Sequence, residues 1–302
     1  MGQQLQMGLR SDVDFSLEVM RDTPETELYP LDAIENRVIL GDALEVLAKM
    51  EAEVADCVFL DPPYFLQLSG RQLRRWKANT TVEGVNDAWD HFASFEEYDA
   101  FIQRTLESLK RVMKPTATLW VIGTYHNIFR IGKIMQDLGY WFLNDVTWIK
   151  TNPMPNWLGV RFTNATETLI WAVKNKEAKG YTFNREEAKR FGVGKVGASV
   201  WVLPICTGRE RLKGEDGKKV HSTQKPVELL RRVILTSTRP GDLILDPMAG
   251  VGTTGYVAWA LERRFVMIEI NPRYAEGMQR RFETPVRFRE VESITQPELM
   301  RR

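Results

Sequence analysis

Cysteine, histidine and long apolar runs are all scarce in this chain. Its 302 residues include only two cysteines, Cys57 and Cys206, which argues against a disulfide framework and favours a reducing cytoplasm. The three histidines lie far apart and no cysteine pairs accompany them, so no metal site is predicted. No apolar run approaches the length of a membrane span, and the first residues lack the apolar segment of a signal peptide. We therefore expect a cytoplasmic protein without metal or membrane association.

A large excess of either charge is also missing. The sequence has 41 Lys and Arg against 40 Asp and Glu, a formal net charge of +1. Any contact with a nucleic acid must therefore come from local basic patches and not from a global field. The hydrophobic content of 43% suits one large domain, with or without insertions.

Short apolar strands alternate with helical patterns along most of the chain. One helix follows the capping box of Ser94 and Glu97 and stops before Pro115, and another opens at Pro226. This alternation predicts an α/β fold with a mainly parallel sheet. The predicted strands cover residues 37–40, 56–61, 117–123, 145–150, 168–174, 242–246 and 265–270.

A glycine turn follows one of these strands, in the stretch LILDPMAGVGTTGYVAWALE. Gly250 and Gly252 allow the backbone to approach a ligand at the end of the strand, next to a helix N-terminus. Glu269 ends the next strand and can accept hydrogen bonds from both hydroxyls of a ribose. The spacing does not match the GxGxxG of dinucleotide sites, and Asp246 would repel a pyrophosphate but tolerate a sulfonium. The pattern favours S-adenosylmethionine over a nicotinamide cofactor. The alternative is a turn that binds no ligand and whose glycines only allow close packing.

The tetrapeptide DPPY, Asp61 to Tyr64, ends a second buried strand. The side chain of Asp61 and the carbonyl of Pro62, whose conformation Pro63 restricts, are two neighbouring acceptors beside the flat ring of Tyr64. Such a site matches an exocyclic amine on a planar base, held for methyl transfer by position and electrostatics. A base in a duplex must be flipped out to reach it. The alternative is a strand-terminating turn with a buried tyrosine.

With these motifs the chain resembles the β class of DNA amino-methyltransferases. DPPY resembles the catalytic motif and LDPMAGVGTT, later in the chain, resembles the cofactor motif; HSTQKPVELLRRVI precedes the latter. Longer stretches such as LWVIGTYHNIFRIG and RFTNATETLIWA are similar to the cell-cycle-regulated adenine methyltransferases that modify GANTC. The similarity covers about residues 36–282. It implies a Rossmann-like methyltransferase fold with a mostly parallel seven-stranded sheet and helices on both faces.

The resemblance also implies roles for individual residues. Asp61, Pro62, Pro63 and Tyr64 would form the adenine pocket, with Asp61 also near the cofactor. Thr223 and Lys225 would bind the methionine end of S-adenosylmethionine, and Glu269 its ribose. The remaining cofactor residues would be Asp42, Asp246, Met248, Gly250, Gly252 and Thr253.

The resemblance further implies partners and a domain division. The family usually forms homodimers, acts on DNA near the nucleoid, and in some cases accompanies a restriction endonuclease. We expect an N-terminal arm (1–34), a catalytic domain (35–285) and a C-terminal tail (286–302). The cell-cycle enzymes carry an extra C-terminal DNA-binding domain, whereas only about 20 residues follow Phe282. Phe65 stands where the family tends to have Asn, and we expect it to alter the fit of the flipped base.

Three irregular segments, about 65–93, 151–165 and 175–222, are predicted to contact DNA. In the first, basic residues surround Trp76, which suits phosphate contact and base stacking as well as a solvated loop. In the second, Asn156, Trp157 and Arg161 suit base reading or a tight polar loop. The basic residues around Trp76 are Arg71, Arg74, Arg75 and Lys77.

The sequence therefore predicts transfer of a methyl group from S-adenosylmethionine to the N6 amine of a flipped adenine in DNA. Aspartate at the head of the motif favours adenine N6 over cytosine N4, but the same fold with N4 activity remains an alternative. A nucleic-acid-binding module that has lost catalysis is another, and a nicotinamide dehydrogenase is disfavoured by the turn.

Overall fold

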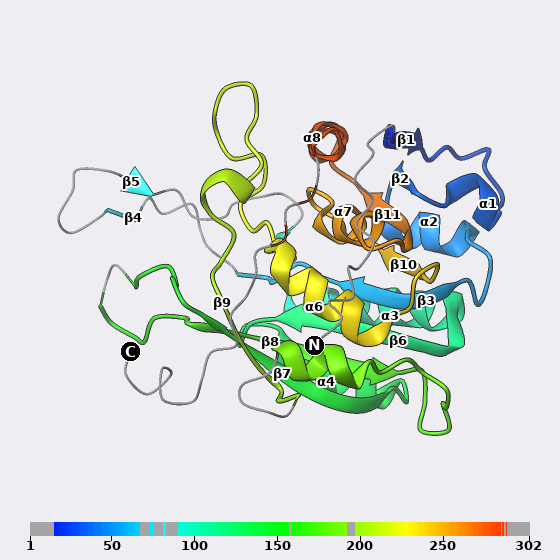
Figure 1. The fold of residues 1–302 in the computed structure, drawn as a ribbon, viewed down its shortest axis with the longest axis horizontal. Helices are drawn as coiled ribbons and strands as arrows, with labels where there is room; N and C mark the ends of the chain where they lie inside the picture. The colour runs from blue at the N-terminus through cyan, green and yellow to red at the C-terminus, as the bar shows by residue number, and fades with distance from the viewer. Residues whose placement is uncertain are drawn as a thin grey trace, which may run out of the picture.

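The computed structural model describes residues 15–66, 90–156, 159–191 and 197–284, residues 286 and 288, and the backbone of two short strands at 73–74 and 81–82. Its centre is a nine-stranded sheet with the order β1-β2-β11-β10-β3-β6-β8-β7-β9 (Figure 1). The strands are β1 (Glu18–Arg21), β2 (Arg37–Leu40), β3 (Ala55–Leu60), β6 (Met113–Gly123), β7 (Trp141–Lys150), β8 (Thr166–Val173), β9 (Val200–Leu203), β10 (Leu243–Asp246) and β11 (Arg264–Glu269). The short strands β4 (Leu73–Arg74) and β5 (Thr81–Val82) pair with each other outside this sheet.

All neighbouring strands are parallel except those that pair with β8, which is antiparallel to both β6 and β7. The carboxyl ends of β2, β11, β10, β3, β6 and β7 therefore meet at one edge of the sheet, where ligands bind in open α/β folds. The loop 151–165 leaves β7 and enters β8 at this same edge. The predicted parallel α/β fold is confirmed.

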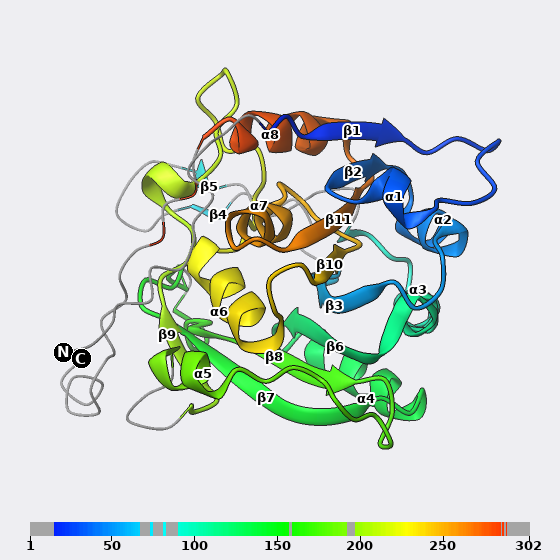
Figure 2. The same cartoon turned by 45° about the vertical axis from the view of Figure 1, so that its right-hand side comes forward.

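Helices cover both faces of the sheet (Figure 2). The first face packs against α2 (Ala43–Lys49), α3 (Phe95–Val112) and α4 (Ile128–Asp137), and the second against α5 (Arg185–Phe191), α6 (Val227–Ser237), α7 (Thr253–Ala260) and α8 (Pro272–Phe282). A separate hydrophobic core lies on each face of the sheet. Alternate residues of β3 point to opposite cores: Val58 and Leu60 to the first, and Cys57 and Phe59 to the second.

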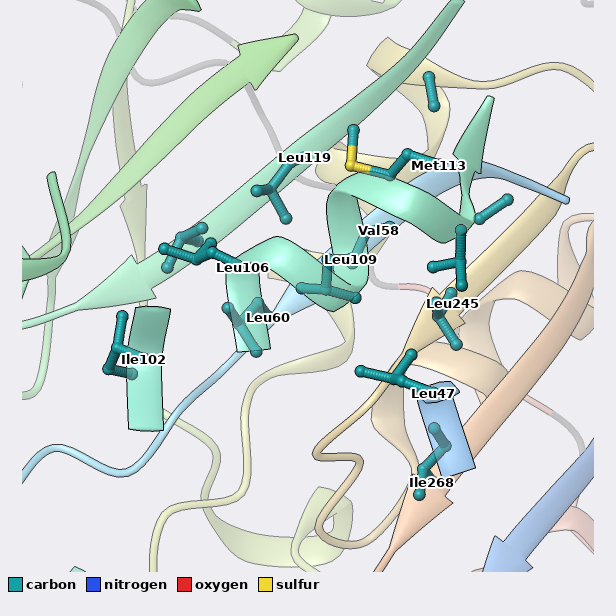
Figure 3. Packing of buried hydrophobic residues seen from close by; sticks show 14 of the residues in the cluster. Leu47, Val58, Leu60, Ile102, Leu106, Leu109, Met113, Leu119, Leu245 and Ile268 are labelled. Atoms are coloured by element: carbon teal, nitrogen blue, oxygen red, sulfur yellow. The ribbon is translucent and has the colours of Figure 1, made fainter. Parts of the chain in front are cut away.

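Figure 3 shows the first core, in which Leu106 and Leu109 of α3 lie over Leu60 and Leu119 of the sheet. Helix α3 buries one stripe because its apolar residues recur at helical spacing, and it begins where the Ser94 hydroxyl accepts a hydrogen bond from the backbone N–H of Glu97. The predicted cap is therefore present. The core fixes the strand ends on which the site depends.

The N-terminal segment differs from its prediction as an arm. Within residues 15–34, β1 adds a parallel strand to the edge of the sheet, and the short helix α1 (Leu31–Ile34) follows it. Leu17, Tyr29 and Ile34 are buried, and Tyr29 donates a hydrogen bond to Asp22. Three buried residues widely spaced in a polar sequence leave little periodicity, which is why the strand is hard to predict from the sequence.

The sheet also has two strands more than predicted. The seven predicted strands form its centre, and β1 and β9 are added at its two edges. Strand β9 lies within the segment 175–222, which was predicted as a loop. No helix among the described residues is long and apolar enough to span a membrane, and no cluster of metal-ligating side chains occurs in that part of the chain.

Candidate active site

A cleft of about 300 Å³ opens at the carboxyl ends of β2, β3, β10 and β11. The structure brings together here all four DPPY residues and every predicted cofactor residue except Gly252. The predicted residues that line the cleft are Asp42, Asp61, Pro62, Pro63, Tyr64, Thr223, Lys225, Asp246, Met248, Gly250, Thr253 and Glu269. Motifs nearly 200 residues apart in sequence meet because their strands, β3 and β10, are neighbours in the sheet.

Asp61 and Lys225 form an ion pair at the floor of the cleft. The ammonium of Lys225 lies 2.6 Å from Oδ2 of Asp61, whereas Oδ1 of Asp61 is buried and has no hydrogen-bond partner in the described part of the chain. Burial alone would lower the pKa of Lys225, but the carboxylates of Asp61 and Glu167 outweigh it and raise the pKa, so the ammonium stays charged. The resemblance implied that this ammonium binds the methionine end of the cofactor; in the structure it lies against the aspartate of DPPY.

Two more carboxylates face the cleft from neighbouring strands. Asp246 accepts hydrogen bonds from the Thr254 hydroxyl (2.5 Å) and the backbone N–H of Met248 (3.1 Å). Glu269 accepts from the backbone N–H of Gly250 (2.7 Å) and from that of Asn271. These bonds leave further lone pairs on each carboxylate for a ligand.

Burial raises the pKa of both groups. The pKa of Asp246 rises to about 7 and that of Glu269 also to about 7, because burial outweighs the hydrogen bonds they accept. Burying several acids close together is costly unless a cation joins them. The cleft therefore suits a ligand with a positive charge and hydroxyl donors.

The glycine turn has the backbone that the sequence predicts. Gly250 and Gly252 both lie in the left-handed region, with φ of 57° and 70°, and Gly252 caps α7. A Cβ at Gly250 would meet the ring of His221 at 3.4 Å, and one at Gly252 would meet Cγ of Met278 at 2.9 Å. Gly252 does not line the cleft, so its role is to pack the turn against α8.

His221 and Asp42 support the cleft from its sides. Nδ1 of His221 accepts a hydrogen bond from the backbone N–H of Thr223 at 3.1 Å, and burial lowers the pKa of His221 to about 3. The imidazole is therefore neutral. Asp42 caps α2 by accepting hydrogen bonds from the backbone N–H groups of Leu44 and Glu45.

The residues behind DPPY hold the motif in place. The carbonyl of Pro63 accepts hydrogen bonds from the hydroxyl of Tyr98 (2.8 Å) and the side-chain amide of Asn127 (3.3 Å). Sequence analysis assigned neither residue a role, because nothing in their local patterns links them to residue 63. Both are buried, so the main chain of the motif has a rigid support.

Phe65 does not act on the cleft as expected. Its ring is buried against Phe92, Phe95 and Tyr98, and it is not among the residues that line the cleft. Its φ of 50° lies in the left-handed region, where Asn is more readily accommodated than Phe. The backbone N–H of Phe65 is held there by the carboxylate of Asp90 at 2.6 Å. The aromatic packing stabilises a conformation that the residue type disfavours.

The hydroxyl of Tyr64 donates a hydrogen bond to Oε2 of Glu167 at 3.0 Å. Glu167 also pairs with Lys150, whose ammonium lies 2.9 Å from Oε1. Both charged residues were missed by sequence analysis, since each stands in an ordinary strand pattern. Their position where β7 ends and β8 begins, at the cleft edge of the sheet, is the feature that could have identified them as candidates.

The predicted DNA contacts are described only in part. In loop 151–165, Arg161 is exposed and donates a hydrogen bond to the hydroxyl of Tyr125 at 2.6 Å, and the Asn156 side chain donates to the carbonyl of Arg161. For Arg74 only the backbone is described, in β4. The other predicted residues lie outside the described part of the chain: Arg71, Arg75, Trp76, Lys77 and Trp157.

Comparison with known proteins supports the methyltransferase interpretation. A family model described as DNA methylase, of the N6 and N4 type, matches residues 55–280. The chain belongs to this family of DNA methyltransferases. It contains the DPPY motif, the glycine turn and Glu269 within the matched residues, so its activity requires S-adenosylmethionine as methyl donor.

Two curated relatives are type II methyltransferases. M.HinfI of Haemophilus influenzae is 48% identical over 246 residues, which are 82% of this chain and 68% of that protein. M2.DpnII of Streptococcus pneumoniae is 39% identical over 251 residues, which are 82% of this chain and 91% of that protein. The prediction of a DNA methyltransferase is confirmed, and the dehydrogenase and the inactive binding module are excluded.

The fold agrees with this assignment. A solved structure of M1.HpyAVI in complex with S-adenosylmethionine has a TM-score of 0.58, with 23% identity, and the match covers 82% of this chain and 98% of that one. The residues of the cleft also fit such a cofactor, independently of the comparisons. Asp246 and Glu269 suit a ligand with a positive charge and ribose hydroxyls, and Gly250 lets the backbone approach that ligand. When bound in this cleft, S-adenosylmethionine would supply an electrophilic methyl group.

Proposed function

We propose that this DNA methyltransferase modifies the N6 amine of adenine, at GANTC or a related site. The observation that carries the proposal is the buried Oδ1 of Asp61, an acceptor beside the ring of Tyr64 for which the described residues offer no hydrogen-bond partner. The amine of a flipped adenine has hydrogens to donate and a flat ring to stack. The resemblance to the GANTC methyltransferases favours this site.

In this proposal the protein acts by position and charge. Oδ1 of Asp61 and the carbonyl of Pro62 accept the two N–H groups, which turns the nitrogen lone pair towards the methyl donor. Tyr64 stacks on the base, a contact worth roughly 1–3 kcal/mol per base in nucleic-acid complexes. The nitrogen would gain the methyl group as the bond of that group to the sulfonium breaks and a neutral thioether leaves, and it would lose one proton, for which the Asp61 carboxylate is the candidate acceptor.

The residues that would hold the cofactor follow from the cleft. We assign Glu269 to the ribose, Asp246 and Met248 to the wall, and Gly250, Gly252 and Thr253 to the turn that shapes it. Thr223 and Lys225 would contact the methionine end, which requires the ammonium of Lys225 to share its charge between that carboxylate and Asp61. Asp42 would lie near the cofactor adenine.

Loop 151–165 is our candidate for DNA contact, together with the segments 65–93 and 175–222. The loop starts at the cleft edge of the sheet, and it exposes Met154, Val160 and Phe162 next to the guanidinium of Arg161. Exposed apolar side chains next to a cation suit unstacked bases and phosphates. We also propose a homodimer that works near the nucleoid beside a cognate restriction endonuclease, as the resemblance implies.

The deciding experiment measures methyl incorporation from labelled S-adenosylmethionine into unmethylated genomic DNA, followed by nucleoside analysis and modified-base sequencing. N6-methyladenine at GANTC is the expected product. N6-methyladenine at another motif would support the proposed methylation of adenine but reject GANTC as the target sequence. N4-methylcytosine would replace the proposal by its main alternative, which the family description equally covers.

A further inference from the structure

A buried ion pair lies where loop 151–165 joins the sheet. Lys150 is the last residue of β7 and Glu167 is the second residue of β8, and their side chains are only 9% and 11% exposed. The backbone N–H of Lys150 also donates to the carbonyl of Ala165 at 2.8 Å, which closes the base of the loop. The pair therefore sits between the candidate DNA loop and the cleft.

The apolar surroundings of this ion pair make the desolvation of its two charges costly in free energy. On β7 and β8 side chains alternate between faces, so Lys150 shares its face with Trp148, and Glu167 shares its face with Leu169 and Trp171. Apolar residues at such positions are often as stable as a buried ion pair, or more so. A charge pair at this position therefore calls for a reason other than stability.

Tyr64 provides that reason. Its hydroxyl donates to Oε2 of Glu167 at 3.0 Å, while Lys225 lies 5.1 Å from the centre of its ring. The ring is thus held at its edge by a carboxylate and at its face by a cation. Burial, followed by the nearby carboxylates of Asp61 and Glu167, raises the pKa of Tyr64 well above its ordinary value, so the hydroxyl keeps its proton and remains a donor.

We propose that Glu167 is a positioning residue for methyl transfer, which acts by fixing the ring of Tyr64 against the target base, with Lys150 holding the carboxylate in place. The inference rests on the proposed role of DPPY in holding a flipped base. No motif identified in the sequence contains the contact between Glu167 and Tyr64.

The test compares variants that remove parts of this contact separately. Glu167→Gln keeps an oxygen that can accept from Tyr64 but loses its charge, Glu167→Leu removes the acceptor, and Tyr64→Phe removes only the donor. Glu35→Gln is the matched control, since Glu35 pairs with Arg264 at 2.8 Å away from the cleft. Each variant is assayed with unmethylated genomic DNA for kcat and KM, for cofactor affinity by calorimetry, and for melting temperature.

We expect Glu167→Leu to lower kcat by about 10- to 100-fold, the loss typical of a hydrogen bond to a charged group. Glu167→Gln should retain most of the activity, and KM for DNA and the cofactor affinity should change by less than about threefold. Tyr64→Phe should lower kcat to a similar extent. Adding Glu167→Leu to Tyr64→Phe should then have little further effect on kcat, because both changes remove the same hydrogen bond. Glu167→Leu also leaves the ammonium of Lys150 without its partner, and the melting temperature measures that loss separately from kcat.

Two results would overturn the inference: wild-type kcat in Glu167→Leu, or multiplied losses in the double variant with Tyr64→Phe. The second would mean that Glu167 supports the structure without acting through the hydroxyl. Absence of any incorporation by the wild-type protein is a different result, because it rejects the proposed function and the inference with it. Activity in the wild type together with an unaffected Glu167→Leu rejects the inference alone.

Discussion

The ammonium of Lys225 contacts one oxygen of the Asp61 carboxylate, at 2.6 Å, and the other oxygen is buried with no hydrogen-bond partner among the described residues. The ion pair fixes the orientation of the carboxylate, because the cation holds Oδ2. Oδ1 is then the oxygen that can accept a hydrogen bond from a ligand in the cleft. Together with the carbonyl of Pro62, it would give the two neighbouring acceptors that the proposed capture of an amine requires.

Replacing Asp61 by Asn should abolish methyl transfer while cofactor binding persists. Asparagine fills the same volume but presents a neutral oxygen and a donor, so it loses the charge that polarises the amine. We expect kcat to fall by about 100-fold or more, by analogy with the loss of one electrostatic group in other active sites. Labelled methyl incorporation gives kcat, and calorimetry gives the cofactor affinity. Near-normal turnover in this variant would rule out the mechanism.

Lys225→Met should destabilise the protein more than Asp61→Asn does. Removing one partner of a buried ion pair leaves the other charge without compensation, at a cost of about 3–5 kcal/mol in free energy of unfolding. The double variant Asp61→Asn/Lys225→Met should recover much of this loss because it buries no unpaired charge. Urea denaturation measures all three. Equal stability of Lys225→Met and the wild type would mean that the pair is solvated.

The strands that build the cleft were predictable because each reads as a short apolar run followed by a motif. The observed β2 and β10 agree with the predicted ranges at both ends or within one residue. DPPY and the glycine turn were predictable for the same reason, since the chemistry is local to each motif. Parallel pairing of β3 and β10 then brings them together without further information.

Contacts between distant segments were not predictable in this way. Glu167 lies in a strand where any residue at the cleft edge fits the pattern, and its contact with Tyr64 depends on the antiparallel position of β8. Phe65 is the converse case, because its departure from the Asn of the family that the chain resembles led us to expect an effect on the fit of the base. The fold instead buries its ring beside Tyr98, which only the three-dimensional packing determines.

The stability of the protein without cofactor should fall as pH rises from about 4 to 7. Asp246 and Glu269 have ordinary pKa values of 3.8 and 4.5, and burial raises each to about 7 in the folded state. Within that window the unfolded chain has released protons that the folded protein still holds, so raising the pH favours unfolding. Urea denaturation at several pH values tests this, and Asp246→Asn should flatten the slope. An unchanged slope in that variant would assign the effect to other groups.

Cofactor affinity should have the opposite pH dependence. A ligand with a positive charge favours the ionised forms of Asp246 and Glu269, so its binding releases protons near pH 7. The dissociation constant of S-adenosylmethionine should therefore fall between pH 6 and pH 8, by up to about tenfold per pH unit for each proton released. Calorimetry in buffers of different ionisation enthalpy counts the protons. A dissociation constant that does not vary with pH would contradict the acidic cleft as the cation site.

Gly252→Ala should destabilise the protein and weaken cofactor binding, with Gly217→Ala as its control. The two glycines have almost the same φ, 70° and 71°, so alanine meets a similar backbone cost of about 1–2 kcal/mol at both. Only at Gly252 would the new Cβ also collide with Met278, at 2.9 Å, whereas nothing lies within 4 Å at Gly217. The overpacking adds about 1–3 kcal/mol to the loss of stability. Equal melting temperatures for the two variants would show that Met278 moves aside freely.

Arg161→Ala should weaken DNA binding in a salt-dependent manner. The guanidinium is exposed on loop 151–165 and donates a hydrogen bond to the Tyr125 hydroxyl at 2.6 Å. The logarithm of the DNA-binding constant falls linearly with the logarithm of the salt concentration. If Arg161 neutralises one phosphate, its removal should make this slope shallower by about 0.9. Fluorescence anisotropy with duplex DNA at several salt concentrations measures the slope. Lys133→Ala on α4 removes the same charge from a side chain that is 74% exposed, and it should leave the slope unchanged. Equal slopes for the two variants would remove Arg161 from the interface and leave the contacts to the other basic segments.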